Sequence, residues 1–443
     1  DIQDSYSEVN WQELDRLYIP AGEYPFIRIE NLPDRSADNP LVITNKGGQV
    51  RVGGQDHYYL MALGGGSNWV LTGRFDSEAE TGHVDYPGHK GGAFANSQGS
   101  YGIMVDDDYL RDGNSGVAVG KRATDFEIEF IEVREVGFAG MTIKTDDVGD
   151  AHMENVSIHD NYIHDTGSEG FYIGSTQEQP QHQIRHFEIY NNRVLRTGTE
   201  AIQIGQVGAD TRIHHNVFGP AAIDWRAAFQ RYQDGNLQIS VRSGRLDVDH
   251  NVFIGAGGTW AGIFGLDVSG DTRSDGDGVY LHDNYFTHSR NLGIFISPDN
   301  ISPMTYRIEN NALRGYRFER DEVYTDADPY GHLIRTFNED VPIEIVDNTW
   351  EGEVDLSNDL PDGNGESGNV TGSDNTNGSI EPVSFVDAGV PTGFDWMKLE
   401  MWTDVASLGD GQPVSYAQDD IVTYQGVPYR CTQSPCETGL VPP

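Results

Sequence analysis

The sequence predicts an all-β protein whose main part is a right-handed parallel β-helix. A four-residue motif that ends in Asn recurs between residues 158 and 348, and its spacing is the length of one solenoid coil. The composition agrees, because 53 Gly and 19 Pro suit a turn-rich β protein better than a helical one. With 443 residues, the chain is long enough for a large core and an extra module.

Seven copies of the motif carry this prediction. They are Ile158-His-Asp-Asn161, Ile189-Tyr-Asn-Asn192, Ile213-His-His-Asn216, Val248-Asp-His-Asn251, Leu281-His-Asp-Asn284, Ile308-Glu-Asn-Asn311 and Ile345-Val-Asp-Asn348. A second strand follows several copies, as in Gly170-Phe-Tyr-Ile-Gly174, and alternate side chains of each strand point into and out of the tube. We expect the Asn column to form an internal ladder with a structural role.

The repeat also sets the expected domain boundaries. Residues 1–354 are assigned to the β-helix, with residues 1–100 as its N-terminal cap and first coils. Residues 355–401 begin with a segment rich in Gly, Asn, Ser and Asp, which predicts a linker. Residues 402–443 are expected to form a small β module, and its Cys431 and Cys436 are the only cysteines, suited to a disulfide in an oxidising compartment.

The charge of the chain limits its partners. The 29 Lys and Arg residues face 70 Asp and Glu residues, so the net charge is −41. Such acidity argues against nucleic acid or an anionic membrane as a partner. No apolar run is long enough to span a membrane. We expect a secreted monomer that acts away from membranes.

Outward side chains of one strand in each coil predict a trough. The strands are aligned on the inward residues Val105, Ile143, Ile173, Ile204 and Ile239. In this alignment, successive rungs present Asp106 and Asp108, then Lys144 and Asp146, then Tyr172, then Gln203, then Gln238 and Arg242. Neighbouring rungs lie ~4.8 Å apart. This grouping favours a groove for a sugar polymer over a sheet that only faces solvent.

Two pairs of carboxylates are the catalytic candidates. Asp108 and Asp146 are expected to face each other on adjacent rungs, and Glu169 and Glu200 occupy equivalent turns that lead into the trough strands. Neighbouring carboxylates separate their pKa values so that one holds a proton, which supplies the acid and base of glycoside hydrolysis. An Asx turn at Asp146 and amide capping by the two glutamates are the alternatives.

Basic residues gather beside the same trough. An insertion at 221–232 predicts a short helix, and its Arg226 joins Arg242 and Lys144 in a cluster suited to sulfate or carboxylate groups. Pairing of these arginines with nearby aspartates is the alternative. The side chains expected to bind substrate are Lys144, Tyr172, Gln203, Arg226, Gln238 and Arg242.

The sequence predicts no cofactor. Asp271, Asp275 and Asp277 have the oxygen ligands that Ca²⁺ prefers, but a turn is the simpler interpretation of their Gly-Asp loop. Three histidines, His159, His214 and His282, follow a strand Ile or Leu on a different outward face, where we expect surface residues.

The coil pattern of residues 161–174 resembles secreted bacterial right-handed β-helix proteins, which include polysaccharide lyases, polygalacturonase-like hydrolases and endo-fucanases. Residues 239–243 resemble the Ile-Ser-x-Lys-Ser strand of alginate and chondroitin lyases, with Arg242 in place of the lysine base. The polygalacturonase motifs are absent. Residues 402–431 resemble chitin- or cellulose-binding modules, with Asp419 in place of the usual Gly.

Three functions follow from these patterns and the resemblance. The first is an endo-acting glycoside hydrolase that cleaves an anionic, sulfated polysaccharide such as a fucan. The second is a polysaccharide lyase in which Lys144 or Arg242 removes a proton from a uronate and Tyr172 protonates the leaving group. The third is a β-helix that binds a polysaccharide without cleaving it.

Overall fold

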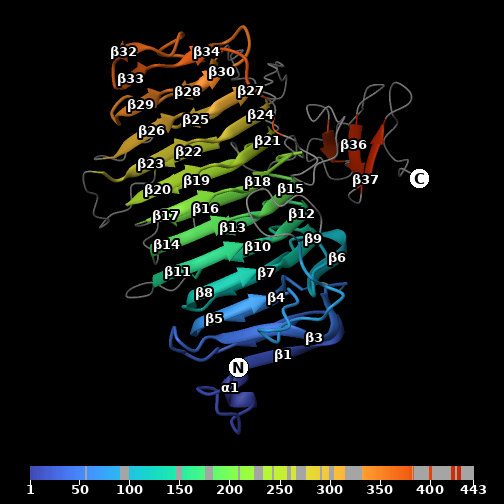
Figure 1. Ribbon diagram of the computed structural model, residues 1–443. Coiled ribbons are helices and arrows are strands. Elements are labelled where there is room, and N and C mark those ends of the chain that lie inside the picture. Colours follow the sequence, from blue (N-terminus) through green and yellow to red (C-terminus); the bar gives the residue numbers. More distant parts are fainter. Residues whose placement is uncertain are drawn as a thin grey trace.

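The computed structural model describes most of the β-helix and parts of the C-terminal region. The described residues are 1–54, 57–89, 99–145, 152–174, 183–207, 210–223, 233–241, 244–256, 261–265, 276–289, 292–298, 304–314, 332–381, 383, 399–401, 421–424 and 427–430. They confirm the predicted right-handed parallel β-helix, whose coils stack along one axis (Figure 1).

Each complete coil contributes three strands, one to each of three parallel sheets, where the sequence had suggested two. The first sheet precedes the Asn turn and consists of β5 (Ser67–Thr72), β8 (Thr124–Glu129), β11 (His152–His159), β14 (Gln183–Tyr190), β17 (Thr211–His214), β20 (Arg245–Asp249), β23 (Gly278–His282), β26 (Thr305–Glu309), β29 (Ile343–Val346) and β33 (Val370–Ser373).

The second sheet follows the Asn turn. It consists of β6 (Ile103–Asp112), β9 (Ile131–Gly137), β12 (Tyr162–Thr166), β15 (Arg193–Thr197), β18 (Val217–Phe218), β21 (Val252–Ala256), β24 (Tyr285–Ser289), β27 (Ala312–Arg314), β30 (Thr349–Trp350) and β34 (Thr376–Asn377). At the N-terminal end, β1 (Arg16–Tyr24) lies on β3 (Leu41–Val52), and β3 bends from the first sheet into the second.

The third sheet closes the coil. It consists of β2 (Ile27–Glu30), β4 (Tyr59–Gly64), β7 (Ser115–Gly120), β10 (Met141–Ile143), β13 (Phe171–Ile173), β16 (Ile202–Val207), β19 (Leu237–Val241), β22 (Ala261–Gly265), β25 (Ile294–Ile296), β28 (His332–Thr336) and β31 (Asp355–Ser357). A short helix, α1 (Ile2–Ser5), precedes β1. Among the described residues, no helix has the length and apolar character needed to cross a membrane.

The predicted Asn ladder fills the corner between the first and second sheets. From Asn161 to Asn348, each side-chain amide donates to the Oδ1 of the next Asn at 3.0–3.1 Å. The same Oδ1 atom also accepts the backbone N–H of the preceding Asn. The residue before each Asn adopts a positive φ, which suits the Asp, Asn and His found there.

Apolar side chains fill the interior along the whole described helix. Inward Ile, Val, Leu and Phe side chains of all three sheets are almost fully buried and form one continuous core. The rings of Phe218, Phe253 and Phe286 stack on one another from coil to coil. Each coil therefore buries its apolar residues against its neighbours, as expected for a solenoid.

The predicted linker is wrong over residues 355–377. Strands β31, β33 and β34 pair with the preceding coil, and β32 (Gly365–Ser367) pairs with β33. Asn375 extends the ladder by one further member, so the polar composition of this segment conceals a last coil. A separate three-stranded sheet follows, made of β35 (Leu399–Met401), β36 (Ile421–Tyr424) and β37 (Val427–Arg430).

Candidate active site

The predicted trough lies on the outer face of the third sheet. The strand pairing confirms that Ile143, Ile173, Ile204 and Ile239 lie in register, with their side chains buried in the core. Alternation then forms a column of neighbouring side chains on the opposite face. In order along the helix they are Ala62, Ala118, Thr142, Tyr172, Gln203, Gln238 and Gly262.

One strand of the predicted trough was assigned to the wrong sheet. Val105 lies in β6, which pairs with β9 of the second sheet, and Val119 of β7 is the true neighbour of Ile143. The register that set Asp108 opposite Asp146 therefore does not hold. The side chain of Asp108 and all of Asp146 lie outside the described residues. Asp106, expected near Lys144, is instead buried.

Asp106 belongs to an ion-pair network on the second sheet. Its carboxylate accepts hydrogen bonds from Arg134 of β9, at 2.7 Å from Nε, and from Arg51 of β3, at 2.9 Å. The sequence alignment missed this because two consecutive strands, β6 and β7, both carry the alternating apolar pattern of an inward strand. The pattern alone does not tell which sheet a strand joins.

A described groove opens on the N-terminal side of Lys144. It has a volume of about 320 Å³, and small residues form its floor where β4, β7 and β10 lie side by side. Its polar lining consists of Arg28, Glu30, Tyr59, Lys121, Thr142, Lys144 and Thr145. The Lys144 Nζ lies 4.8 Å from the centre of the Tyr172 ring. Lys144 thus links the groove to the next rung of the trough.

Glu169 and Glu200 stack at the corner between the second and third sheets. The backbone N–H of Gly140 donates to the Glu169 carbonyl, and the N–H of Gly170 donates to the Glu200 carbonyl, so the two residues occupy equivalent turns. A side chain at Gly170 would meet the Ala201 carbonyl at 2.6 Å, so this tight corner requires glycine. The prediction that the two glutamates occupy adjacent rungs is confirmed.

These two carboxyl groups are buried with few partners. Glu169 is 1% exposed and Glu200 is fully buried. Among the described residues, neither oxygen of Glu200 and only one oxygen of Glu169 has a partner in good hydrogen-bond geometry, although the Thr199 hydroxyl and a backbone N–H lie near Glu200. An unpaired carboxylate in such a place is costly, so protonation is the expected response.

The surroundings separate the pKa values of the pair. Burial raises the pKa of Glu200 well above its usual value and the nearby charge of Glu169 raises it further, while the Thr199 hydroxyl and a backbone N–H oppose that shift. Burial also raises the pKa of Glu169, but the Ser168 hydroxyl and the positive charge of Lys144 oppose that shift. Glu200 is therefore the group that keeps its proton, and Glu169 is the group that ionises first.

Other polar groups surround this corner. Gln203 and Asp234 are buried, and the Asp234 charge also raises the pKa of Glu200. The side-chain oxygens of Asn236 and Gln238 are buried and have no partner among the described residues. The sequence analysis missed Asn236 as a site residue, because it lies outside the trough strands and carries no repeat pattern. Arg226 and Arg242 lie outside the described residues.

The arrangement offers a neutral acid beside an ionised carboxylate. The two residues lie in equivalent turns of adjacent coils, whose strands are ~4.8 Å apart. Retaining glycosidases hold their two carboxyl groups ~5–5.5 Å apart and inverting ones ~6.5–9.5 Å apart, so carboxyl groups separated by about one strand spacing would suit retention. Of the predicted Ca²⁺ ligands, only Asp277 lies among the described residues, so that site stays a prediction.

Comparison with known proteins identifies the fold. No family model and no curated sequence matches the chain. The structure is similar to a lacto-N-biosidase from Eubacterium ramulus, with 12% identity over 83% of this chain and 63% of that chain and a TM-score of 0.51. It is also similar to an alginate lyase from Paenibacillus, with 14% identity over 84% of this chain and 95% of that chain and a TM-score of 0.44.

A third similar structure is an exopolygalacturonase from Thermotoga maritima, with 13% identity over 80% of this chain and 84% of that chain and a TM-score of 0.42. Identities this low relate the proteins by fold alone. The reactions in the names of these proteins are therefore not transferred to this chain.

Proposed function

We propose that this protein is a glycoside hydrolase that cleaves a polysaccharide, with Glu200 as general acid and Glu169 as nucleophile or base. The observation that carries the proposal is the buried carboxyl pair, whose surroundings favour a proton on one member and a charge on the other. The named activities of the structural neighbours are compatible with a polysaccharide substrate.

The spacing of the pair favours a retaining reaction. Glu169 would attack the anomeric carbon while Glu200 protonates the leaving oxygen, and Glu200 would then deprotonate the water that releases the sugar. Because both carboxyl groups are excluded from solvent, substrate binding must expose them to the sugar. The groove that ends at Lys144 is the approach we favour.

We propose an anionic, sulfated substrate such as a fucan. Three basic residues, Arg28, Lys121 and Lys144, line the groove of a chain whose net charge is −41. Glu30 pairs with Lys121 at 2.8 Å, whereas Lys144 has no carboxylate within ion-pair distance among the described residues. Lys144 is thus available to bind a sulfate or carboxylate group. Endo-action, secretion and a monomeric state belong to the same proposal.

The test compares E169Q and E200Q with E366Q, which changes an exposed glutamate away from the pair. The full chain is incubated with fucans, carrageenans, alginate, pectins and chitin, and products are measured as new reducing ends and by mass. We expect both site variants to lose at least about 10²-fold in kcat on the accepted polymer, and E366Q to keep its activity. Unchanged turnover in both site variants would show that the pair is not catalytic.

A lyase is the second candidate, because Lys144 lies against the Tyr172 ring and the two would supply a base and an acid. A lyase forms an unsaturated uronate that absorbs in the ultraviolet, whereas a hydrolase adds water. If the ultraviolet absorbance rises with E169Q and E200Q but not with K144M, the protein is a lyase and not a hydrolase.

A further inference from the structure

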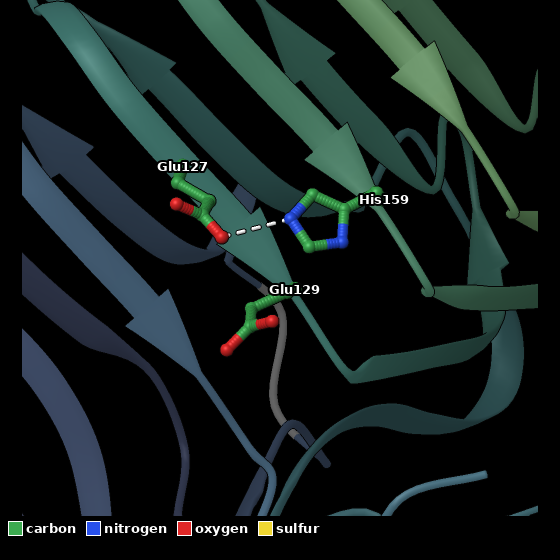
Figure 2. Close-up of side chains that lie close together, drawn as sticks. All are labelled: Glu127, Glu129 and His159. Atoms are coloured by element: carbon green, nitrogen blue, oxygen red, sulfur yellow. Dashed lines mark hydrogen bonds and ion pairs between the residues drawn. The ribbon is translucent and has the colours of Figure 1, made fainter. Parts of the chain in front are cut away.

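Three side chains on the first sheet form a cluster that the proposed function does not use. Glu127 and Glu129 project from β8, and His159 projects from the adjacent strand β11 (Figure 2). His159 is paired with Glu129 across the two strands, so all three lie on the same face. One nitrogen or oxygen atom from each residue lies within 4.8 Å of the other two.

Neighbouring groups fix the orientation of His159. Its Nε2 lies 2.8 Å from Glu127 Oε1, and its Nδ1 lies 2.8 Å from Asp160 Oδ2. The ring also stacks on Tyr190, with centroids 4.5 Å apart. The histidine was expected on the surface, but it is 7% exposed. A carboxylate that holds Nδ1–H while Nε2 faces other ligands is the arrangement found behind metal-bound histidines.

The second sheet carries the same motif five residues later in the chain. His164 Nε2 lies 3.2 Å from Glu132 of the preceding coil, and its Nδ1 lies 2.6 Å from Asp165. The two motifs differ at the position paired with the histidine, which is Arg134 beside His164 and Glu129 beside His159.

The two motifs differ in the groups that bind the aspartate beside the histidine. On the second sheet, Arg196 binds both oxygens of Asp165 at 2.7 Å, and Arg134 is a further cation. On the first sheet, Asp160 is bound instead by His89 at 3.2 Å. His89 Nδ1 also lies 2.6 Å from the Tyr101 hydroxyl, to which Arg193 donates.

The first-sheet cluster thus places the carboxyl groups of Glu127, Glu129 and Asp160 around one imidazole ring. The guanidinium of Arg74 lies over the Phe130 ring at 5.0 Å and contributes positive charge only from a longer distance. The cluster therefore lacks the arginine contacts that the equivalent carboxylate has on the second sheet. A divalent ion in place of the Nε2 proton of His159 would supply positive charge at this position.

We propose that Glu127, Glu129 and His159 bind a divalent first-row transition-metal ion, with Zn²⁺ the favoured ion, and that this ion joins two adjacent coils of the β-helix. Metal bonds of ~2.0–2.2 Å to N and O place the ligand atoms at most ~4.4 Å apart, so a small rotation of Glu129 completes the site. The site depends on its own geometry and is independent of the proposed hydrolase.

The ligand set selects the class of ion. Imidazole nitrogen suits Zn²⁺ and related transition metals, whereas Ca²⁺ and Mg²⁺ prefer oxygen ligands alone. Two carboxylates and one imidazole supply three ligands, which leaves a fourth tetrahedral position for water. Asp160 acts as a positioning residue, because it holds the ring through Nδ1.

The experiment titrates the chelator-treated full chain with Zn²⁺ by calorimetry and with Co²⁺ by visible absorption. We expect one site that raises the thermal midpoint when filled. E129Q and D160N should each weaken binding about 10-fold or more. E129R copies the charge found beside His164, so it should abolish binding and leave the metal-free midpoint unchanged or higher.

Two matched variants test whether other histidines explain any binding. His214 bonds Glu188 at 2.8 Å in the same way, but Tyr190 stands in the position of Glu129, so E188Q should keep full affinity. His215 lies 2.8 Å from His214 and offers a rival nitrogen cluster. Loss of Zn²⁺ binding in H215A but not in E129Q, absence of binding in the wild-type chain, or tighter binding of Ca²⁺ than of Zn²⁺ would overturn the proposal.

Discussion

Two corners of the β-helix stack polar side chains from coil to coil, and they differ in whether those side chains satisfy one another. Between the first and second sheets, Asn161 to Asn375 form a column in which every amide oxygen from Asn192 onward accepts the amide of the Asn before it. Between the second and third sheets, Glu169 and Glu200 stack in the same way, but most of their oxygens have no partner among the described residues.

The difference follows from the chemistry of the two side chains. An amide has both a donor and an acceptor, so a column of any length can satisfy itself in the interior. An ionised carboxylate has only acceptors, so two stacked carboxylates repel and one must take up a proton. The Asn column follows the rule that buried polar groups find hydrogen-bond partners, whereas the Glu pair breaks that rule. Local exceptions of this kind are typical of functional sites.

The largest expected effect is the loss of one Asn from the middle of the ladder. N216A would remove the acceptor of the Asn192 backbone N–H and the side-chain donor to the Ile189 carbonyl oxygen in a buried corner. At about 1–3 kcal/mol for each buried group left unpaired, the free energy of unfolding should fall by several kcal/mol. Denaturant unfolding measures this. N155G, which removes an exposed amide bound to Asp125 and keeps a residue suited to the positive φ of this position, should cost less than about 0.5 kcal/mol. Equal costs would contradict the structural role of the ladder.

E200Q should have the opposite effect on stability at neutral pH. Because folding raises the pKa of Glu200 well above its usual value, its contribution to stability is complete below that usual value and is lost as the pH rises through the folded pKa. Glutamine does not ionise, so E200Q should match the wild type at pH 4 and be more stable at pH 8. Thermal midpoints across this range measure the difference. A constant difference at all pH values would show that Glu200 does not titrate in the folded protein.

The fold was predictable because its main determinants are local and repeated. Seven copies of one motif revealed the ladder, and period-two alternation identified the inward residues from Ile143 to Ile239. The last coil was missed because Asn375 lies in a polar segment without an apolar strand pattern. The third strand of each coil was missed because strands such as Val217–Phe218 are too short to show a period-two pattern.

The site was predictable only in part, since it depends on register and burial. The equivalent places of Glu169 and Glu200 in two coils were visible in the sequence, but their complete burial was not. The alignment of Val105 with Ile143 failed because alternation does not specify a partner strand. His159 was predicted to be a surface residue. The sequence does not show that Glu129 is its neighbour on the adjacent strand, at the position that Arg134 occupies beside His164.

A smaller effect should follow from removing the charge that distinguishes the two glutamates. Lys144 lowers the pKa of Glu169 against the effect of burial, so K144M should raise that pKa and narrow the difference from Glu200. If Glu169 must be ionised for the reaction, the acidic limb of kcat/KM will move to higher pH. K121M is the matched control, because Lys121 lines the same groove but pairs with Glu30. The pH profile of K121M should not shift, while its KM rises. A shift of the acidic limb in K121M but not in K144M would show that Lys144 does not set the pKa of Glu169.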